Sequence, residues 1–527
     1  METIFQVDGK PFFPLGGQAH NSSAYSPDEL ASFWKACAAM QANTAEVPVY
    51  WERVEPAEGA FDFSMVDDIL SGARARKLRV ILLWFGTWKN GAMKYSPLWV
   101  KNNPKRFWRV LTHDGVATPV LSEHCPETLA ADSRAFAALL RHLKRQNADG
   151  TVLAVQVQNE PGMRTGAQRD HGAEAERLFN APVPAALMKR LAAAQGTCPH
   201  ETWKKAGGRA KGHWAEVFGA RHAPEYFSAW HIARYINAVA AAGKKEYALP
   251  MYVNVWNDHA GFDIAGLCYP SGGPTTKVLD LWKWAAPEIA LIAPDIYSQS
   301  TKSFCMHCGI YARPDNPLFI PESGIDESSS RHIFYAIAQH HAVGYGMFGV
   351  ESMLDAEGTV KPEAQAAVDS ARIVAAMLPL IVRRHAGGQV HAVVQDEGAL
   401  EQYIDLGEYA GLVRFESIRG DYHHPAKPRS PERGRGLVIQ EGPREFFVAG
   451  SAFKLLIVRK EATDERALWR YIDPLAMSCG DFATVEEGRF SDAGDWQARR
   501  TRSGDESDWG IWVWPDVGAV RVVMATP

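Results

Sequence analysis

Short apolar runs alternate with stretches of helical spacing over residues 12–377 of the 527-residue chain. This alternation constrains the fold most, because a repeated strand–helix order requires a parallel sheet covered by helices. The runs with the length and apolar content of buried strands are residues 12–18, 44–50, 80–85, 152–158, 250–255, 290–296, 318–321 and 344–350. Eight strand–helix units in this order favour a closed (β/α)8 TIM barrel over an open sheet.

A second domain is predicted after residue 380. Short alternating runs separated by turn-rich segments occur at 390–394, 437–439, 445–448, 453–458 and 510–513, a pattern typical of a β-sandwich. We therefore expect a barrel domain at 1–380 and a smaller β-rich domain at 381–527. The barrel domain carries a long insertion at 161–224, which is predicted to lie on a βα loop and to shape the mouth of the active site.

Composition excludes several classes of protein. The formal net charge of −5 gives no reason to expect a nucleic-acid partner. We expect no membrane span, because no run of about 18 apolar residues occurs. The N-terminus lacks the features of a signal peptide, which favours the cytoplasm, or the periplasm or exterior if a signal was removed. The seven cysteines do not form a regular disulfide pattern. The oligomeric state stays open, a homo-oligomer included.

Two glutamates stand where a barrel places its chemistry. Glu160 ends the apolar run 152–159, and Glu322 follows the run 318–321. The C-terminal ends of barrel strands form the catalytic face, and the fourth and seventh strands lie across the mouth from each other. Glycoside cleavage requires two carboxyl groups across the scissile bond, about 5–5.5 Å apart in retaining enzymes. The pair therefore points to glycoside hydrolysis.

An Asn-Glu pair ending strand 4, with a second Glu ending strand 7, resembles the clan of retaining barrel glycosidases. Within that clan the sequence resembles the family 35 and family 42 β-galactosidases, in a bacterial β-galactosidase-like subgroup with a C-terminal β domain. Residues 7–12 (VDGKPF) resemble the family 35 opening. Residues 43–51 (NTAEVPVYW), with 55–56 and 59–63, resemble the second strand and its loop. The resemblance covers residues 4–355.

The resemblance implies a role for each matching residue. Glu160 is expected to be the acid/base and Glu322 the nucleophile. Asn159 is expected to hydrogen-bond the sugar 2-hydroxyl, an interaction that strengthens in the transition state. Tyr297, just after the sixth strand, resembles the tyrosine that supports the nucleophile.

Two departures from family 35 stand out. Its members carry a sugar-binding Cys-Ala-Glu stretch after strand 3, whereas residues 83–91 (LWFGTWKNG) hold no acid. Their His-Tyr after strand 1 is replaced here by His20-Asn21. Both departures fall where the family recognises the non-reducing sugar.

Further binding residues are predicted from the strand ends. Trp51, Trp88 and Trp256 follow strands 2, 3 and 5 and are candidates to stack on a sugar ring, although a tryptophan is more often core. Asn90 is a candidate to bind hydroxyls, and Glu351, after strand 8, is a candidate binding residue. Other polar groups in these loops are Lys89, Asn257 and Asp258.

No metal or cofactor is predicted. The cluster Cys305-Met306-His307-Cys308, even with Cys268, lacks four zinc ligands at a suitable spacing. Residues 344–349 (GYGMFG) spell Gly-x-Gly-x-x-Gly, but they fall within a predicted strand rather than between a strand and a helix. Small residues in a crowded barrel strand explain this match better.

The sequence therefore favours a retaining exo-β-glycosidase that acts by double displacement. The foremost candidate is a β-galactosidase that hydrolyses terminal β-galactosides of oligosaccharides or plant-derived glycosides. The same fold on another sugar is the alternative, as a β-glucosidase, an α-L-arabinopyranosidase or an endo-acting glycanase. A non-catalytic carbohydrate-binding barrel is the remaining alternative.

Overall fold

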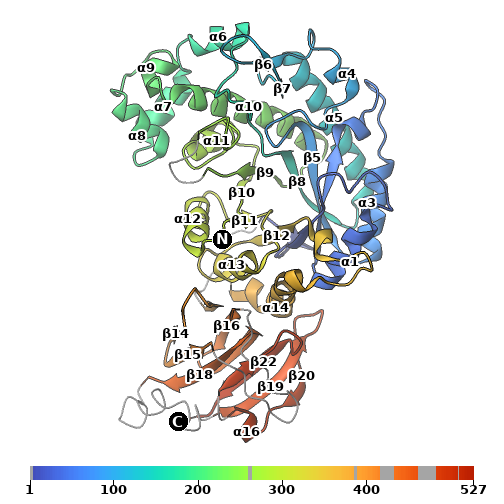
Figure 1. The fold of residues 1–527 in the computed structure, drawn as a ribbon, viewed down its shortest axis with the longest axis vertical. Helices are drawn as coiled ribbons and strands as arrows, with labels where there is room; N and C mark the ends of the chain where they lie inside the picture. Colours follow the sequence, from blue (N-terminus) through green and yellow to red (C-terminus); the bar gives the residue numbers. More distant parts are fainter. Residues whose placement is uncertain are drawn as a thin grey trace.

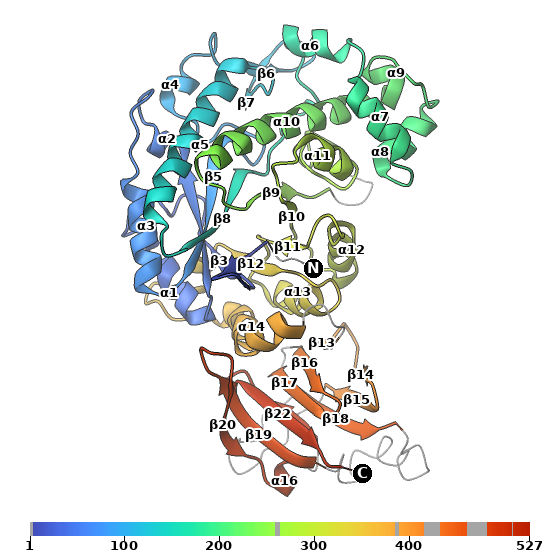
Figure 2. The ribbon, with the colours of Figure 1, turned by 180° about the vertical axis from the view of Figure 1, so that it is seen from behind.

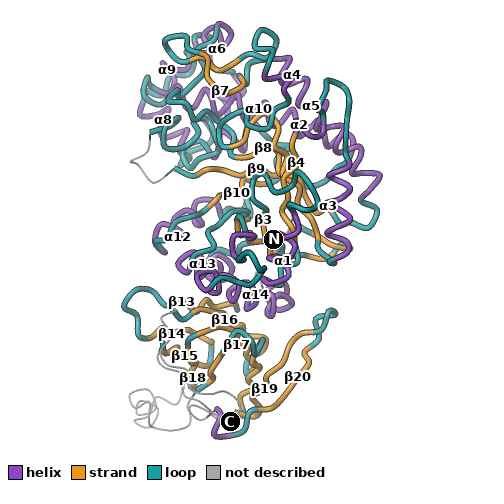
Figure 3. Tube along the Cα trace, turned by 45° about the vertical axis from the view of Figure 1, so that its right-hand side comes forward, coloured by secondary structure: helices purple, strands orange, loops and turns teal. Residues whose placement is uncertain are grey.

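The computed structural model describes residues 4–258, 264–384, 389–415, 433–460, 482–507 and 510–526. The chain forms two parts that follow one another along the long axis of the molecule (Figures 1 and 2). In the larger part helices and strands alternate, whereas strands dominate the smaller C-terminal part (Figure 3).

The larger part is built on eight parallel strands in the order β10-β9-β8-β5-β4-β3-β12-β11. Their bounds are β3 (Leu15–Gln18), β4 (Thr44–Tyr50), β5 (Arg79–Lys89), β8 (Val152–Asn159), β9 (Met251–Trp256), β10 (Leu291–Asp295), β11 (Phe319–Ile320) and β12 (Gly344–Phe348). Each strand lies within or overlaps one of the predicted runs. The predicted barrel is therefore confirmed.

The sheet closes between β10 and β11 through few backbone contacts. Ile296 and Ser323 form an isolated parallel bridge, and the Ile296 amide donates to the Glu322 carbonyl at 2.9 Å. The Asn316 side chain completes the seam, because it accepts from the Ile292 amide at 2.8 Å and donates to the Ile292 carbonyl at 3.0 Å. A side chain thus satisfies backbone groups that the two-residue strand β11 leaves open.

Helices cover the outside of the barrel, one principal helix after each strand. They are α1 (Leu30–Met40), α3 (Ser64–Ala75), α5 (Pro126–Gln146), α10 (Ala223–Glu246), α11 (Leu279–Ala285), α12 (Thr301–Tyr311), α13 (Glu327–Ala338) and α14 (Gln365–Arg384). Helix α5 is one of the longest of them. Pro126 occupies its first turn, where a missing amide hydrogen costs nothing.

Smaller elements decorate the loops. They are β1 (Gln6–Val7), β2 (Lys10–Pro11), α2 (Trp51–Val54), α4 (Leu98–Lys101), β6 (Arg109–Leu111), β7 (Ala117–Leu121), η1 (Val350–Met353) and η2 (Pro362–Ala364). The predicted insertion holds α6 (Ala173–Phe179), α7 (Ala185–Ala193), α8 (Cys198–Lys205) and α9 (Trp214–Phe218). It lies at the end of the barrel farthest from the C-terminal part (Figure 1).

The C-terminal part is an antiparallel β-sandwich, as predicted. One sheet has the order β13-β16-β17-β22-β19-β20 and the other β14-β15-β18-β21. Their bounds are β13 (Val390–Val394), β14 (Glu401–Leu406), β15 (Tyr409–Arg414), β16 (Arg435–Gly442), β17 (Glu445–Ser451), β18 (Phe453–Arg459), β19 (Phe482–Phe490), β20 (Trp496–Thr501), β21 (Ile511–Val513) and β22 (Ala519–Met524), with a short helix α16 (Gly504–Ser507). Buried residues from both sheets, such as Val413, Phe446 and Trp512, form its core.

Helix α14 joins the two parts. The outer face of the larger sheet, with Leu437, Ile439 and Phe447, belongs to the same buried cluster as the barrel residues. Residues 362–383 are long and apolar enough to cross a membrane, but most of this segment is buried between the barrel and the sandwich. Its apolarity is therefore that of a core helix.

The predicted explanation of the Gly-x-Gly-x-x-Gly match holds. Gly346 lies in β12, where a Cβ atom would collide with the Glu46 carboxylate and the Pro321 carbonyl. Gly16, on the neighbouring strand β3, faces the same carboxylate. The glycines thus make room for a glutamate in the barrel interior. Burial raises the pKa of Glu46 well above its ordinary value, and the charge of Glu322 adds to this effect.

Candidate active site

A cavity of about 380 Å³ opens at the C-terminal ends of the barrel strands. Its walls come from the ends of β5, β8, β9, β10, β11 and β12, from the loops after the strands, including the loop after β3, and from α12. The lining residues are Asn21, Lys89, Asn90, Glu160, Trp256, Asn257, Asp295, Ile296, Tyr297, Ser298, His307, Glu322 and Phe348. Both predicted catalytic glutamates are therefore in one cavity.

Glu160 is held in an unusual backbone conformation. Its φ of 44° and the φ of 66° at Gln158 lie in the left-handed region, which side-chain-bearing residues seldom adopt. Two backbone contacts fix the turn: the Glu160 amide donates to Asn254 Oδ1 at 2.9 Å, and the Gly91 amide donates to the Glu160 carbonyl at 3.0 Å. Such conformations persist only where the surroundings impose them, and they cluster at functional sites.

A buried aspartate on α5 anchors the strand end that carries Glu160. Asp132 Oδ2 accepts from Gln158 Nε2 at 2.7 Å and from Thr87 Oγ1 at 2.7 Å, and Oδ1 accepts from Trp84 Nε1 at 2.9 Å. Gln158 in turn accepts from the Trp88 amide at 3.0 Å. One carboxylate therefore ties the ends of β5 and β8 together, and this fixes the direction in which Glu160 leaves the barrel.

Glu322 is surrounded by hydrogen-bond donors. Its Oε1 accepts from Gln18 Nε2 at 2.9 Å, from Asn159 Nδ2 at 3.2 Å and from Asn254 Nδ2 at 3.3 Å. Its Oε2 accepts from the Tyr297 hydroxyl at 2.9 Å. An ionised carboxylate accepts hydrogen bonds and donates none, so the four donors around Glu322 suit a negative charge on this side chain.

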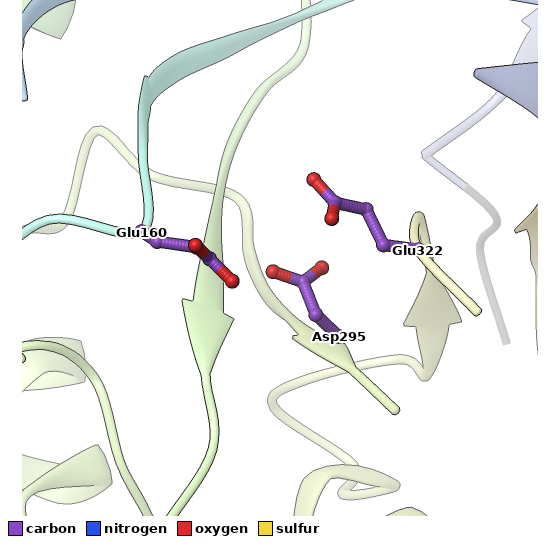
Figure 4. A group of neighbouring side chains, drawn as sticks. All are labelled: Glu160, Asp295 and Glu322. Atoms are coloured by element: carbon purple, nitrogen blue, oxygen red, sulfur yellow. The ribbon is translucent and has the colours of Figure 1, made fainter. Parts of the chain in front are cut away.

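A third carboxylate, Asp295, stands between the two glutamates (Figure 4). One oxygen from each of Glu160, Asp295 and Glu322 lies within 4.8 Å of the other two. Asp295 ends β10 and is held by Asn254 Nδ2, which donates to Oδ2 at 2.7 Å, and by Asn257 Nδ2, which donates to its carbonyl at 2.9 Å. Three buried acids at this distance cannot all be ionised without a large electrostatic cost.

The surroundings raise the pKa values of two of these acids, Glu160 and Asp295. Burial raises the pKa of Glu160 from 4.5 to about 7; the charge of Lys89 opposes this, whereas that of Glu322 adds to it. Hydrogen bonds from Asn90 and Asp295 also lower the pKa of Glu160. Burial, followed by the charges of Glu322 and Glu160, raises the pKa of Asp295 well above its ordinary value. Glu160 and Asp295 interact strongly and therefore titrate as a pair.

Lys89 and Asn90, at the end of β5, contact the residues around these three acids. Lys89 is buried and donates to Asn159 Oδ1 at 2.7 Å. The Asn159 amide is thereby oriented, because its oxygen accepts from the lysine while its nitrogen donates to Glu322. The Asn90 amide donates to Glu160 Oε2. The segment in which family 35 members carry an acid thus holds a cation and an amide here.

The remaining predicted residues divide between the cavity and the core. Trp256, Asn90 and Tyr297 line the cavity. Trp51 and Trp88 do not: both are fully buried, Trp51 donating to Glu55 Oε2 at 2.9 Å and Trp88 packing edge-on against Tyr235 at 4.8 Å. The prediction that these two tryptophans stack on a sugar is corrected, because their faces are used by the core.

Glu351 is also outside the cavity. Its Oε1 accepts from the His20 amide at 2.9 Å, and the His20 ring lies 2.6 Å from the Ser352 hydroxyl. The carboxylate therefore fastens the loop after β3 to the loop after β12. The prediction of a binding role for Glu351 is replaced by a structural one.

Several site residues were not predicted. Gln18 and Asn254 are polar residues inside apolar strands, and His307 reaches the cavity from α12. Their side-chain directions depend on strand register and helix placement, which the local pattern does not give. Asp295, unlike these residues, could have been predicted. It stands at the end of the sixth strand, just as Glu160 and Glu322 stand directly after the fourth and seventh strands. The rule that found the glutamates applies to it as well.

Among the described residues, Glu160, Asp295 and Glu322 are the one group placed to share a metal ion. The amide and hydroxyl hydrogens of four neighbours already point at Glu322, an environment suited to an anion. In the segment predicted to lack a zinc site, His307 faces the carbonyls of Ser303 at 2.8 Å and Asp258 at 3.0 Å, and Cys308 is buried.

Comparison with known families matches both parts of the chain. Residues 26–195 match the family model described as β-galactosidase, of glycoside hydrolase family 42. Residues 370–514 match a domain of unknown function, DUF5597. The first match includes Glu160 and ends before Glu322. The predicted resemblance to family 42 is therefore confirmed, and the family 35 part of the prediction is corrected.

Similar proteins include β-galactosidases. One from Xanthomonas manihotis is 33% identical over 172 residues, which are 30% of this chain and 25% of that protein, so this chain matches a quarter of its relative's length. The crystal structure of the cold-adapted enzyme from Rahnella sp. R3 has a TM-score of 0.51 at 18% identity, covering 75% of this chain and 59% of that one. The structure from Bacillus circulans sp. alkalophilus also has a TM-score of 0.51, at 13% identity, covering 72% and 58%. These likenesses show the fold.

Proposed function

We propose that this protein is a retaining exo-β-glycosidase, foremost a β-galactosidase, with Glu322 as nucleophile and Glu160 as acid/base. The observation that carries the proposal is the placement of oxygens from both glutamates within 4.8 Å in one cavity. Carboxyl groups about 5–5.5 Å apart suit double displacement, whereas inverting enzymes need about 6.5–9.5 Å to admit a water molecule.

The first step forms a glycosyl-enzyme. A Glu322 oxygen bonds to the anomeric carbon while the bond to the leaving oxygen breaks, and Glu160 gives its proton to that oxygen. The raised pKa of Glu160, about 7, keeps the proton available near neutral pH. Asn159 is fully buried between Lys89 and Glu322, so its amide orients the nucleophile, and the predicted contact with the sugar 2-hydroxyl is not supported by this arrangement.

The second step reverses the proton flow. Once Glu322 is an ester it has no charge, and one of the causes that raise the pKa of Glu160 disappears. Glu160 then takes a proton from water, the water oxygen bonds to the anomeric carbon, and the ester bond breaks. Glu322 is released as a carboxylate into its four donors. The proton ends on Glu160, and the enzyme is restored.

The galactosyl preference is supported by the family 42 match and by the name of the Xanthomonas relative. The cavity of about 380 Å³ has room for a terminal sugar and part of the leaving group, which favours exo action. Glucosides, arabinopyranosides and endo substrates remain the alternative substrates. The walls hold Lys89 and Asn90 where family 35 enzymes carry an acid, so the sugar must be tested directly.

A panel of 4-nitrophenyl glycosides, followed by proton NMR of the first product, tests the proposal. We expect the β-galactoside to be cleaved fastest, and the sugar to appear first as its β-anomer. Release of the α-anomer would contradict the retaining mechanism. Binding without turnover across the panel would instead favour a carbohydrate-binding barrel.

A further inference from the structure

Two cations contact residues that line the cavity near Glu160. Arg164 follows Glu160 by four residues, and its guanidinium lies 4.4 Å from the ring centre of Trp256, which lines the cavity. Lys94 lies in the loop after β5, and its ammonium is 3.4 Å from Asn90 Oδ1. Since Asn90 itself donates to Glu160, both cations belong to the acid/base side of the site.

The cations are close enough to affect one another. Burial lowers the pKa of Lys94, and the charges of Lys89 and Arg164 lower it further, whereas that of Glu160 opposes them. Within the described ranges, the side chains of Lys94 and Arg164 form no salt bridge, while neighbouring basic residues such as Lys101 and Arg169 are paired with Glu52 and Glu176. Both side chains are exposed and accessible to a ligand, and an anion that contacts both would be attracted by two positive charges.

We propose that Arg164 and Lys94 bind an anionic group, a carboxylate or a sulfate, on the leaving-group portion of the glycoside. This inference rests on the proposed function, because Glu160 marks the leaving-group side only if it is the acid that protonates the leaving oxygen. Arginine and lysine donors recognise both kinds of oxyanion through charge-assisted hydrogen bonds. The guanidinium of Arg164 lies over the ring of Trp256, and this contact keeps the charge beside the cavity that Trp256 lines.

Matched substrates isolate the anion. Lactobionate and lactitol share the galactosyl group, the linkage and an open-chain leaving group, and they differ by a carboxylate in place of a hydroxymethyl group. A second pair tests sulfate in the same way: lactose with a sulfate on O6 of its glucose is compared with lactose itself. At low salt we expect kcat/KM to be higher for the charged member of at least one pair, by roughly tenfold, since charge-assisted hydrogen bonds strengthen binding to this degree.

Variants assign the preference to the two cations. The charged-to-neutral ratio of kcat/KM is expected to fall towards one in Arg164→Gln and in Lys94→Gln, and to be retained in Arg164→Lys. Arg177→Gln removes an equal charge from the exposed surface of α6, where Arg177 pairs with Glu174, and is expected to keep the ratio of the unmodified protein. Added salt should lower the ratio as well, because screening weakens exposed charge pairs.

The outcomes separate this inference from the proposed function. A ratio near one in both arms, with 4-nitrophenyl β-galactoside cleaved normally, overturns the anion site and leaves the glycosidase intact. A preference that survives in both glutamine variants overturns the assignment to Arg164 and Lys94. Failure to cleave any glycoside in the panel overturns the proposed function, and the anion site with it.

Discussion

Glu160 and Glu322 face each other across one cavity, yet their surroundings are opposite. Glu322 accepts hydrogen bonds from Gln18, Asn159, Asn254 and Tyr297, which suit a negative charge. Glu160 has fewer donors, Asn90 and Asp295, and burial dominates the rise of its pKa to about 7.

The difference supports the proposed roles more strongly than strand position does. Both glutamates follow barrel strands, so their sequence context alone would permit either role. A side chain held as an anion is suited to attack carbon, and a side chain held as a neutral acid is suited to give a proton. Two glutamates would thus perform different chemistry because hydrogen-bond donors surround Glu322, whereas burial dominates at Glu160.

Removing the nucleophile is expected to have the largest effect. Glu322→Gln keeps the shape of the side chain but cannot form the ester, so kcat should fall by roughly 10⁴-fold or more, about 5 kcal/mol of transition-state stabilisation. Steady-state hydrolysis of 4-nitrophenyl β-galactoside measures the loss. Glu351→Gln is the matched control, since this strand-end glutamate lies outside the cavity and contacts His20 instead. A comparable loss in the control would indicate a general structural effect.

Replacing the proposed acid/base is expected to affect substrates differently, according to how much their leaving group needs a proton. Glu160→Gln should lower kcat/KM for an unactivated galactoside by roughly 10²–10⁴-fold, the usual contribution of general acid catalysis. A 2,4-dinitrophenyl galactoside needs no protonation to leave, so its first step should be spared and a burst of phenolate should precede slow turnover. Stopped-flow absorbance detects the burst. Equal losses on both substrates would assign Glu160 a different role.

Weakening the donor set around Glu322 should have a smaller effect. Tyr297→Phe removes the hydroxyl that donates to Oε2 at 2.9 Å and leaves the ring. A hydrogen bond to a charged group contributes about 1.5–3 kcal/mol, so kcat should fall by roughly 10- to 150-fold. The same assay applies, with thermal unfolding to show that the fold is retained. Unchanged kcat would mean that the donor shell does not stabilise the reacting charge.

The smallest effect is expected on pH dependence. Activity of the unmodified protein should decline above about pH 7, where Glu160 loses its proton. The hydrogen bond from Asp295 lowers the pKa of Glu160, so Asp295→Ala should move this decline to higher pH, whereas Asp295→Asn retains a donor and should move it less. Profiles of kcat/KM for the three proteins measure the shift. Movement to lower pH in the alanine variant would contradict the assigned direction.

Much of the architecture could be predicted from the sequence, because barrel strands are short apolar runs with regular spacing. The strand-end rule found Glu160 and Glu322, and applied consistently it would have found Asp295. Gln18 and Asn254 could not be found in this way. They lie within apolar strands, and only the three-dimensional register shows that their amides meet at Glu322.

The tryptophans show where a local pattern fails. Strand β5 continues to Lys89, beyond the predicted run 80–85, so Trp88 lies within a barrel strand and not in a loop after it. Trp88 turns into the core, while Lys89, the next residue, enters the cavity. This part of the strand contacts Asp132 of α5 through Trp84 and Thr87, and such contacts between distant residues are not visible in the local pattern.

Labelling by a 2-deoxy-2-fluoro galactosyl fluoride tests the central claim most directly. The fluorine slows hydrolysis of the glycosyl-enzyme, so the ester accumulates and can be located by peptide mass spectrometry. The opposite surroundings of the two glutamates predict a single sugar adduct, on the peptide that contains Glu322. An adduct on Glu160, or complete inactivation with neither glutamate modified, would contradict the account.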